Sequence, residues 1–393
     1  MKKPLNIVCH AFPSWHGDYV KSTVELMKAL AGNNKVLYID YAYTLKDLVL
    51  SFRKNTWVPA KRMLGFKEPL RKVELNNGTH LHLLSLPPVL PVNWISNQLV
   101  FNFFQSINAR LMNRRIRYAA KQLEMNDPLV INAFNPTNAK NTLKGLNPKA
   151  TLYYCYDNIS AAAWACKHGS RLEKNLIREA DAVIFSSDDL KKTKGKEAKT
   201  AYVIKNGVDL SVFKRDQVQQ VSAITKQTVN IGYIGSVDDR LDYELLFQTI
   251  QNHPHWQFHF IGRILDTRAQ KLQSFANVKI SGAVEPHELP GLMKHFNAGI
   301  IPFVKNDFTQ TIYPMKANEY LAMGLPVVMT DFAQLNDLKH MVSITNRQHF
   351  NEMLELAVQT DSEEKKLQRI AHSETNSWKC KASELESLLY QYA

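Results

Sequence analysis

Short apolar segments alternate with amphipathic helical segments along most of the chain. The first series opens with an apolar run at Leu5–Cys9, a glycine-containing loop, a helical pattern from Val20 to Leu30 and a second apolar run at Lys35–Asp40. Strand, loop, helix and strand in this order are typical of a doubly wound α/β domain with a parallel sheet. Because the strands of such a sheet are buried on both faces, they read as continuous apolar runs. This alternation limits the fold more strongly than any single motif.

The same alternation continues and then begins a second time. Further strands of the first series are predicted at 129–133, 151–155, 182–185 and 201–204, and strands of the second series at 229–235, 257–261, 278–280, 299–302 and 327–329. A chain of 393 residues is long enough for two domains, each with its own core. We predict a Rossmann-like domain over residues 1–207, a second one over 208–377, and a C-terminal helix over 378–393 that packs back on the first domain.

Cysteine usage and hydropathy indicate the compartment. The four cysteines lie apart without CxxC spacing, so the sequence suggests neither a zinc site nor a disulfide framework. The apolar run near the N-terminus is too short for a signal peptide. No apolar run reaches the roughly 20 residues that span a bilayer. We therefore expect a cytoplasmic protein.

The net charge of +13 is unevenly distributed. Residues 1–200 hold 30 Lys and Arg against 15 Asp and Glu, whereas the remainder holds 19 against 21. A basic half indicates a polyanionic partner for that half, either anionic lipid or nucleic acid, or a basic surface that only aids solubility. Within residues 44–125, Trp, Phe and Leu alternate with Lys and Arg. This pattern suggests an element on a membrane surface, or helices whose aromatic faces pack inward.

The stretch Ile312–Thr330 predicts a loop, a short helix, a tight turn and a buried strand. Pro314 suits the first helical position and Gly324 the position after the last turn. Lys316 would lie in the first turn, where the helix dipole disfavours a cation unless an anion binds there. Glu319 lies one turn on, on the same face. The pair therefore predicts a site for a nucleotide diphosphate and its ribose, or alternatively a surface ion pair.

Three segments, in order, resemble two-domain glycosyltransferases of the GT-B type. Lys205–Asp209, followed by Phe213, resembles the segment where such enzymes cross between domains. Gly232–Ser236 resembles the strand and glycine turn that open their nucleotide-sugar domain, and Pro314–Val328 resembles their donor-binding helix. The resemblance implies an α/β protein whose two Rossmann-like domains face a cleft.

Within that group the sequence is most similar to bacterial enzymes that build exopolysaccharides and teichuronic-type polymers, including the xanthan-pathway glucuronosyltransferase group. The resemblance implies transfer of a sugar from a nucleotide sugar to a glycan or polyprenyl-diphosphate-linked acceptor. It implies no metal and no other cofactor. With the basic N-terminal half, it also implies peripheral association with the anionic inner face of the cell membrane, and no nucleic-acid partner.

The resemblance assigns roles to individual residues of the second domain. The donor diphosphate is expected to contact Lys316 and the start of the helix that carries it. The full set of residues expected to contact the diphosphate is Gly235, Ser236, Arg240, Thr309, Thr311 and Lys316. The ribose and base are expected at Tyr313, Met315 and Glu319. Arg240 could equally belong to a turn with local ion pairs, and Asp238 and Asp239 read as caps of the following helix. Family-4 enzymes usually carry a glutamate where this chain has Thr311.

Asp157 is the expected general base, because it ends a predicted strand of the first domain and carboxyl ends of strands line the crevice of open α/β sheets. An Asx turn with Asn158 is the alternative. The loop Trp15, His16, Gly17 and Asp18 is expected on the acceptor side.

Two other functions remain open from the sequence. A nucleotide-sugar epimerase or hydrolase on the same architecture would not need the basic, aromatic region 44–125. A nucleic-acid-binding protein would account for the basic half, but the sequence contains no recognised DNA or RNA module.

Overall fold

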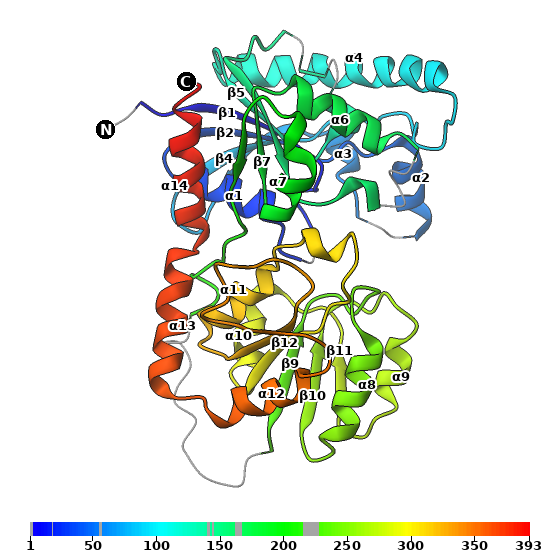
Figure 1. Cartoon of the computed structure of the whole chain (residues 1–393). Helices are drawn as coiled ribbons and strands as arrows, with labels where there is room; N and C mark the ends of the chain where they lie inside the picture. Colours follow the sequence, from blue (N-terminus) through cyan, green and yellow to red (C-terminus); the bar gives the residue numbers. More distant parts are fainter. Residues whose placement is uncertain are drawn as a thin grey trace. The chain divides into compact units, whose positions relative to one another are not determined.

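The computed structural model describes residues 3–17, 19–54, 57–139, 142–143, 145–161, 167–214 and 228–393. The chain forms two compact units (Figure 1). Unit 1 comprises Met1–Gly17, Lys21–Lys205 and Lys381–Ala393, and unit 2 comprises Asp18–Val20 and Asn206–Cys380. The predicted α/β class with two parallel-sheet domains is confirmed.

Unit 1 is organised around an eight-stranded sheet in the order β3-β4-β2-β1-β5-β6-β7-β8. Its strands are β1 (Asn6–Ala11), β2 (Lys35–Ile39), β3 (Leu70–Glu74), β4 (His80–Leu84), β5 (Leu129–Ala133), β6 (Ala150–Cys155), β7 (Ala182–Phe185) and β8 (Ala201–Val203). All neighbouring pairs are parallel except β3 and β4. The predicted strands of this half lie within about two residues of the observed ones.

The hairpin β3–β4 was not predicted as strands. It joins two alternating segments through Asn76-Asn77-Gly78, and Gly78 has a φ of +78°. An Asn-Gly pair between alternating segments favours a hairpin turn, because Gly tolerates the positive φ that such a turn needs. The signal was present in the sequence but lay inside the region 44–125, which otherwise lacks a regular pattern.

Helices cover both faces of this sheet. They are α1 (Ser22–Leu30), α2 (Leu45–Lys54), α3 (Ala60–Met63), α4 (Gln98–Gln122), α5 (Pro136–Ala139), α6 (Gly169–Glu179) and α7 (Asp188–Lys194), with short 3₁₀ turns at Ile159–Ala161 and Gly195–Glu197. In the described part of the chain, no helix combines the length and hydropathy needed to cross a membrane.

Unit 2 is organised around a six-stranded parallel sheet in the order β11-β10-β9-β12-β13-β14. Its strands are β9 (Asn230–Ile234), β10 (Gln257–Ile261), β11 (Val278–Ser281), β12 (Ala298–Ile301), β13 (Val327–Thr330) and β14 (Ser343–Thr345). Its helices are α8 (Tyr243–Asn252), α9 (Ala269–Gln273), α10 (Leu289–Met293), α11 (Met315–Ala322), α12 (Phe350–Gln359) and α13 (Glu363–Thr375), with 3₁₀ turns at Pro286–Glu288 and Thr309–Thr311.

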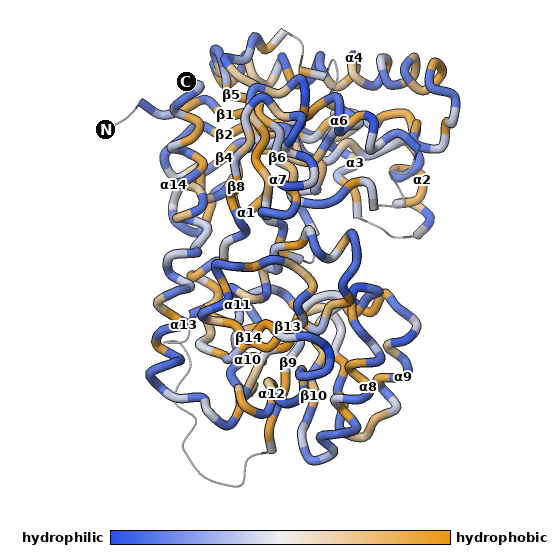
Figure 2. Tube along the Cα trace, viewed as in Figure 1, coloured by the Kyte–Doolittle hydropathy of each residue, from blue (hydrophilic) through white to orange (hydrophobic). Residues whose placement is uncertain are grey.

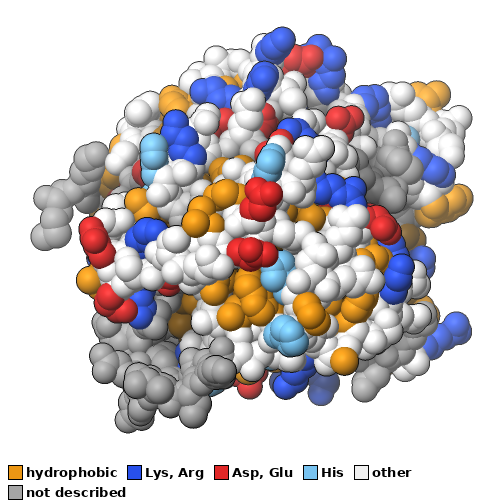
Figure 3. Space-filling model, turned by 60° about the horizontal axis from the view of Figure 1, so that its bottom comes forward, with side chains coloured by type: hydrophobic (Ala, Val, Ile, Leu, Met, Phe, Trp, Pro, Cys, Tyr) orange, Lys and Arg blue, Asp and Glu red, His pale blue; other side chains and the backbone are white. Residues whose placement is uncertain are grey.

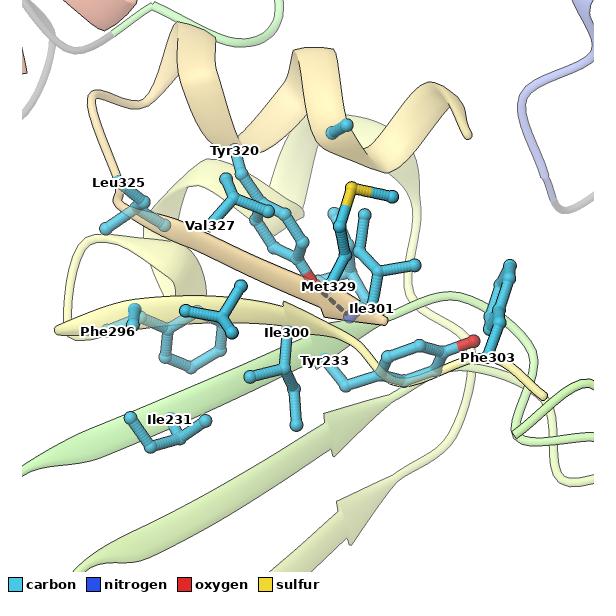
Figure 4. Close-up of a cluster of buried hydrophobic side chains, with 14 of the residues drawn as sticks. Ile231, Tyr233, Phe296, Ile300, Ile301, Phe303, Tyr320, Leu325, Val327 and Met329 are labelled. Atoms are coloured by element: carbon cyan, nitrogen blue, oxygen red, sulfur yellow. Dashed lines mark hydrogen bonds between the residues drawn. The ribbon is translucent and has the colours of Figure 1, made fainter. Parts of the chain in front are cut away.

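The core of unit 2 places α11 against the middle of its sheet. Tyr320 of α11 lies over β9 and β12 on the same side of the sheet as Ile301, Val327 and Met329 (Figure 4). Its hydroxyl accepts a hydrogen bond from the Ile234 amide at 2.9 Å, and a side chain at Gly299 would clash with its ring at 2.7 Å. The orientation of α11, and of the Lys316 side chain that it carries, is therefore fixed by packing.

The hydropathy of the residues agrees with this arrangement of helices packed on sheets. The strands of both sheets are predominantly hydrophobic along the tube in Figure 2, as expected for parallel sheets buried on both faces. The face shown in Figure 3 carries acidic and basic side chains interspersed around a group of hydrophobic ones.

Apart from the short segment Asp18–Val20, the chain leaves unit 1 once and returns to it once. In unit 2 the two connecting segments pair, since the Val208 amide donates to Asn376 O at 3.0 Å and the Trp378 amide to Val208 O at 3.0 Å. The last helix, α14 (Trp378–Leu389), then enters unit 1, where Asn34 Nδ2 donates to Glu386 Oε1 at 2.5 Å.

Candidate active site

Lys316 lies in the first turn of α11, and its ammonium group is enclosed by aromatic rings. Nζ donates to the Tyr233 hydroxyl at 2.8 Å and lies 4.1 Å from the centre of that ring and 4.8 Å from the centre of Phe303. Tyr233 is the second-last residue of β9 and Phe303 follows β12, so both rings lie at the carboxyl edge of the sheet (Figure 4). Cation–π contacts of this kind stabilise a desolvated ammonium.

Burial shifts the pKa values of Lys316 and Glu319, the pair that the sequence predicted to bind the nucleotide. Desolvation, with a smaller contribution from Arg240, lowers the pKa of Lys316 to about 7. Desolvation also raises the pKa of Glu319 to about 7, against the opposing effect of Lys316. Near pH 7 both groups are therefore poised between charged and neutral forms. Perturbed pairs of this kind are typical of functional sites.

Two glycine turns bring the backbone close to Lys316. Gly235 follows β9 with a φ of +117°, and Gly262 follows β10 with a φ of +154°. A Cβ atom on Gly235 would lie 2.9 Å from Lys316 Nζ, and one on Gly262 would lie 2.1 Å from Gly235 O. Neither position has room for a side chain. Ser236, the next residue, accepts a hydrogen bond from Tyr233 Oη through its carbonyl oxygen at 2.8 Å.

Arg240 lies beside this turn but is engaged in an ion pair. Its guanidinium donates to Asp238 from Nε at 2.9 Å and from Nη2 at 2.5 Å, and lies 5.4 Å from the Phe303 ring. Closing over a phosphate would require it to leave Asp238. The interpretation of Asp238 and Asp239 as helix caps was wrong, because Asp242 caps α8 by accepting from the Leu245 amide at 3.0 Å.

The two threonines of the preceding loop face inward. Thr309 Oγ1 donates to Val304 O at 2.5 Å, and Thr311 Oγ1 donates to Phe308 O at 2.6 Å. Both side chains are buried. These hydrogen bonds give the threonines a part in shaping the loop that leads to α11, and a contact with phosphate would require the bonds to break.

The three residues predicted to bind the nucleoside, Tyr313, Met315 and Glu319, differ in their burial and in their contacts. Tyr313 is buried and donates to Asp337 Oδ2 at 2.8 Å, which ties it to the interior of unit 2. Met315 is half-buried at the first residue of α11, while Glu319 is buried one turn after Lys316. The helix begins at Met315, one residue after the predicted start at Pro314.

Sequence reasoning did not single out Asn318. Its Nδ2 donates to Asn206 O at 2.9 Å, and Asn206 Nδ2 in turn donates to Tyr313 O at 2.8 Å. These bonds fasten α11 to the segment that connects the units. The adjacent Asn-Gly pair marked that segment in the sequence, whereas nothing in the helix pattern distinguished Asn318.

Asp157 of unit 1 follows β6 at the carboxyl edge of the sheet. Its Oδ1 accepts from the Asn158 amide at 2.7 Å, and the side chain is half-buried. A row of aromatic rings runs along the same edge. Phe12 lies 5.6 Å from Tyr41 and 6.1 Å from Phe134, which lies 4.5 Å from Tyr156.

Phe134 has a φ of +53°, which is rare for an aromatic residue and is typical of functional sites. Asp157 directly follows Tyr156, the last ring of this row, in which Phe134 is buried and Phe12, Tyr41 and Tyr156 are half-buried.

The loop after β1 contains the predicted acceptor-side residues. The Trp15 amide donates to Asp40 Oδ1 at 2.8 Å, and the Trp15 ring lies 5.2 Å from Tyr38. His16 contacts Arg71, and Gly17 is exposed with a φ of +150°. Asp18 lies outside the described residues.

Across the residues that the structure describes, no group of three His, Cys, Asp or Glu side chains could hold a metal ion. The expectation of a metal-free reaction stays a prediction.

Comparisons with known proteins match the second half of the chain most strongly. Residues 228–357 match the family model of glycosyl transferases group 1. The chain is 28% identical over 178 residues to TuaH of Bacillus subtilis (strain 168), a protein assigned to teichuronic acid biosynthesis as a glycosyltransferase. That alignment covers 42% of this chain and 44% of the relative, so it spans less than half of either protein.

Solved structures match the whole chain. Sucrose-phosphate synthase from Thermosynechococcus elongatus superposes with a TM-score of 0.70 at 15% identity, over 99% of both chains. An E. coli structure named for trehalose-6-phosphate, bound with UDP-2-fluoro glucose, gives a TM-score of 0.66 at 11% identity over 98% of both chains. The chain therefore has the GT-B fold, and its residues 228–357 match the family model of glycosyl transferases group 1.

Proposed function

We propose that this protein transfers a sugar from a nucleotide-diphosphate sugar to a lipid-linked precursor of a cell-surface polysaccharide. The family match of residues 228–357 and the partial similarity to a protein of teichuronic acid biosynthesis support the reaction class and the pathway type. The related fold that binds UDP-2-fluoro glucose supports a nucleotide-sugar donor.

The observation that carries the proposal is the enclosed ammonium of Lys316 at the start of α11, beside two turns where only glycine fits. A departing nucleoside diphosphate develops negative charge on its phosphates, and preorganised donors at that position stabilise it. Lys316, the free amides at the helix start and the open backbone at Gly235 supply such donors. Asp157 would accept the proton of the acceptor hydroxyl.

Association with the inner face of the membrane is part of the proposal. Large apolar side chains of unit 1 are exposed on or near α2, α3 and the start of α4, including Phe52 (76% exposed), Phe66 (79%), Trp94 (71%) and Leu99 (80%). Lysines and arginines alternate with them in the sequence, as expected for an element that lies on an anionic lipid surface.

A donor screen tests the proposal. Thermal-shift measurements with UDP, GDP, dTDP and their sugars should raise the melting temperature with one nucleotide only, because bound ligand stabilises the folded state by mass action. The nucleotide sugar so identified should then support transfer to a membrane extract. If no nucleoside diphosphate stabilises the protein, the proposal fails. If the nucleotide sugar is epimerised or hydrolysed without any acceptor, the epimerase alternative is correct.

A further inference from the structure

A second group of cationic side chains lies in unit 1, distinct from the Lys316 site. Arg71 is on β3 opposite Leu83 of β4, which places it at the carboxyl edge of the sheet. Its Nη2 contacts Nε2 of His16, in the loop after β1. The His16 ring packs against Trp57 with ring centres 4.5 Å apart. Residues far apart in sequence thus meet at one point of this edge.

Backbone contacts hold a second cation, Arg62, near Arg71 and the neutral ring of His16. Arg62 of α3 donates from Nη1 to Glu68 O at 2.5 Å. Arg115 of α4 donates to Met63 O at 2.9 Å and so fixes the end of α3. Lys21 donates to Ser14 O at 2.6 Å and to His16 O at 2.5 Å, which fixes the loop that carries His16. The group is therefore positioned before any ligand binds.

The two guanidinium groups of this cluster are not paired directly with a carboxylate in the part of the chain that the structure describes. Among the described residues, neither Arg62 nor Arg71 forms an ion pair with a carboxylate, and Arg71 Nε is buried without a hydrogen-bond partner. Asp40 attracts Arg71 electrostatically, but its carboxylate already accepts hydrogen bonds from the Trp15 amide at 2.8 Å and the Tyr41 amide at 2.9 Å.

The like charges repel one another in this setting. Burial, then Arg71, Lys21 and Arg62, lower the pKa of His16. Burial, then Arg62, lower the pKa of Arg71 against the opposing effect of Asp40. A buried guanidinium nitrogen without an acceptor is costly, so a bound anion would stabilise the group.

The sheet order connects this group to the rest of the unit 1 edge. From β3 the strands run through β4, β2, β1 and β5 to β6. The cationic group therefore lies at one end, the aromatic row of Tyr41, Phe12, Phe134 and Tyr156 follows, and Asp157 lies at the far end. At about 4.8 Å between strands, the β3-to-β6 span is roughly 24 Å. That span suits an extended ligand with an anionic end and a sugar.

We propose that His16, Arg62 and Arg71 bind a phosphate or diphosphate group of the acceptor, whose sugar lies over the aromatic row toward Asp157. This inference rests on the proposed function for the identity of the ligand as an acceptor. Guanidinium groups suit phosphate because they donate two parallel hydrogen bonds. Trp57 beside His16 is 59% exposed and belongs to the exposed apolar region of unit 1, so a lipid-linked diphosphate could keep its chain in the membrane.

Binding of short diphosphates tests the site. The measurements use the Lys316→Ala background, so that diphosphate bound at the donor site does not contribute. Calorimetry in this background should detect farnesyl diphosphate and inorganic pyrophosphate but not farnesol. Arg71→Gln should weaken both by about 10- to 150-fold, the usual effect of losing a hydrogen bond to a charged group. Lys72→Gln, one residue on and 53% exposed, is the matched control and should leave both unchanged.

Each result of these titrations either supports or overturns the proposed phosphate site. Tighter binding of farnesyl diphosphate than of pyrophosphate supports a lipid-linked acceptor, and equal binding supports a soluble phosphorylated one. Absence of diphosphate binding, or equal binding by Arg71→Gln and its control, overturns the inference. Arg62→Gln, at a half-buried position of α3, repeats the test if Arg71→Gln lowers the melting temperature. Nucleotide binding of Arg71→Gln in the presence of Lys316 stays intact, so a failed donor screen is distinguishable from a failed phosphate site.

Discussion

Lys316 and Glu319 occupy adjacent turns of α11, and burial brings both of their pKa values to about 7. A cation in the first turn opposes the helix dipole, and enclosing it between two rings removes it from water as well. Such an arrangement is stable when an anion completes it. At the residue scale, the site is therefore prepared for a ligand that carries negative charge.

We expect Lys316→Ala and Glu319→Ala each to weaken binding of the nucleoside diphosphate by about 10- to 150-fold. The first removes a charge partner of the phosphates, and the second removes an acceptor for the ribose. Isothermal titration calorimetry measures both. Lys305→Ala is the matched control, because Lys305 is 62% exposed and pairs with Asp331 in the same unit. Unchanged affinity in both site variants would refute the assignment.

The pH dependence of nucleotide binding should follow from the same pair. As pH rises through about 7, Lys316 loses its positive charge and Glu319 becomes negative. Both changes make the site less favourable for phosphate, so affinity should fall from pH 6 to pH 8.5. In Lys316→Gln the Lys316 contribution disappears and the slope should be shallower. Calorimetric titrations at four pH values would show this, and parallel slopes in the two proteins would contradict it.

Asp157→Asn should keep the fold and the nucleotide affinity yet lower turnover by about 10² to 10⁴-fold, the usual contribution of a general base. A general base acts only in the chemical step, so its loss lowers turnover without changing nucleotide affinity. Turnover is measured with donor and acceptor saturating. Asp127→Asn, an exposed carboxylate in the loop before β5, should behave as the parent. A loss of less than about threefold in Asp157→Asn would leave Asp157 as a residue of the turn.

At the element scale, the glycine turns after β9 and β10 depend on each other. A side chain on Gly262 would collide with the carbonyl of Gly235, and that glycine in turn leaves space for Lys316 Nζ. The two adjacent strands can therefore present their backbone to a ligand only while both turns keep glycine.

Gly262→Ala should destabilise unit 2 by about 1–3 kcal/mol, the usual cost of a strained backbone conformation. For a domain of 150–250 residues, each kcal/mol shifts the melting temperature by about 2–4 °C. Gly291→Ala is the control, because no atom lies within 4 Å of the added Cβ. Thermal unfolding followed by circular dichroism measures both, and equal melting temperatures would show that the turn can rearrange.

At the scale of the whole molecule, charge and exposed apolar surface are concentrated in the N-terminal half. Residues 1–200 carry twice as many basic as acidic residues, and the exposed Phe52, Phe66, Trp94 and Leu99 belong to the same half. If this half lies on the membrane, unit 1 receives the lipid-linked acceptor and unit 2 receives the soluble donor.

Co-sedimentation with vesicles should therefore increase with the fraction of phosphatidylglycerol and decrease with added salt, because salt screens the attraction between lysines and anionic lipid. Trp94→Ser and Leu99→Ser should each lower the bound fraction. Leu367→Ser is the control, as Leu367 is 60% exposed on α13 in unit 2. Binding that is independent of both lipid charge and salt would leave the basic half with a role in solubility only.

The sequence by itself determined the fold class and much of the strand positions. Leu129–Ala133, Ala182–Phe185 and Gln257–Ile261 begin and end at the residues predicted from the sequence. The reason is that a strand buried on both faces needs an unbroken apolar run, which is a local property. The sequence also predicted that Lys316 and Glu319 lie on one face of a helix, because the helical repeat is a local property as well.

Only the tertiary structure decided which predicted site residues form hydrogen bonds within the protein. It also decided which residues far apart in the sequence come into contact. Local sequence did not show that Tyr313 donates to Asp337, or that Thr309 donates into its own loop. It also did not show that His16 meets Arg71, 55 residues away in the chain. Such contacts depend on the order of strands in the sheet and on the packing of loops against it. Those properties arise from many long-range interactions together, and no single stretch of sequence contains them.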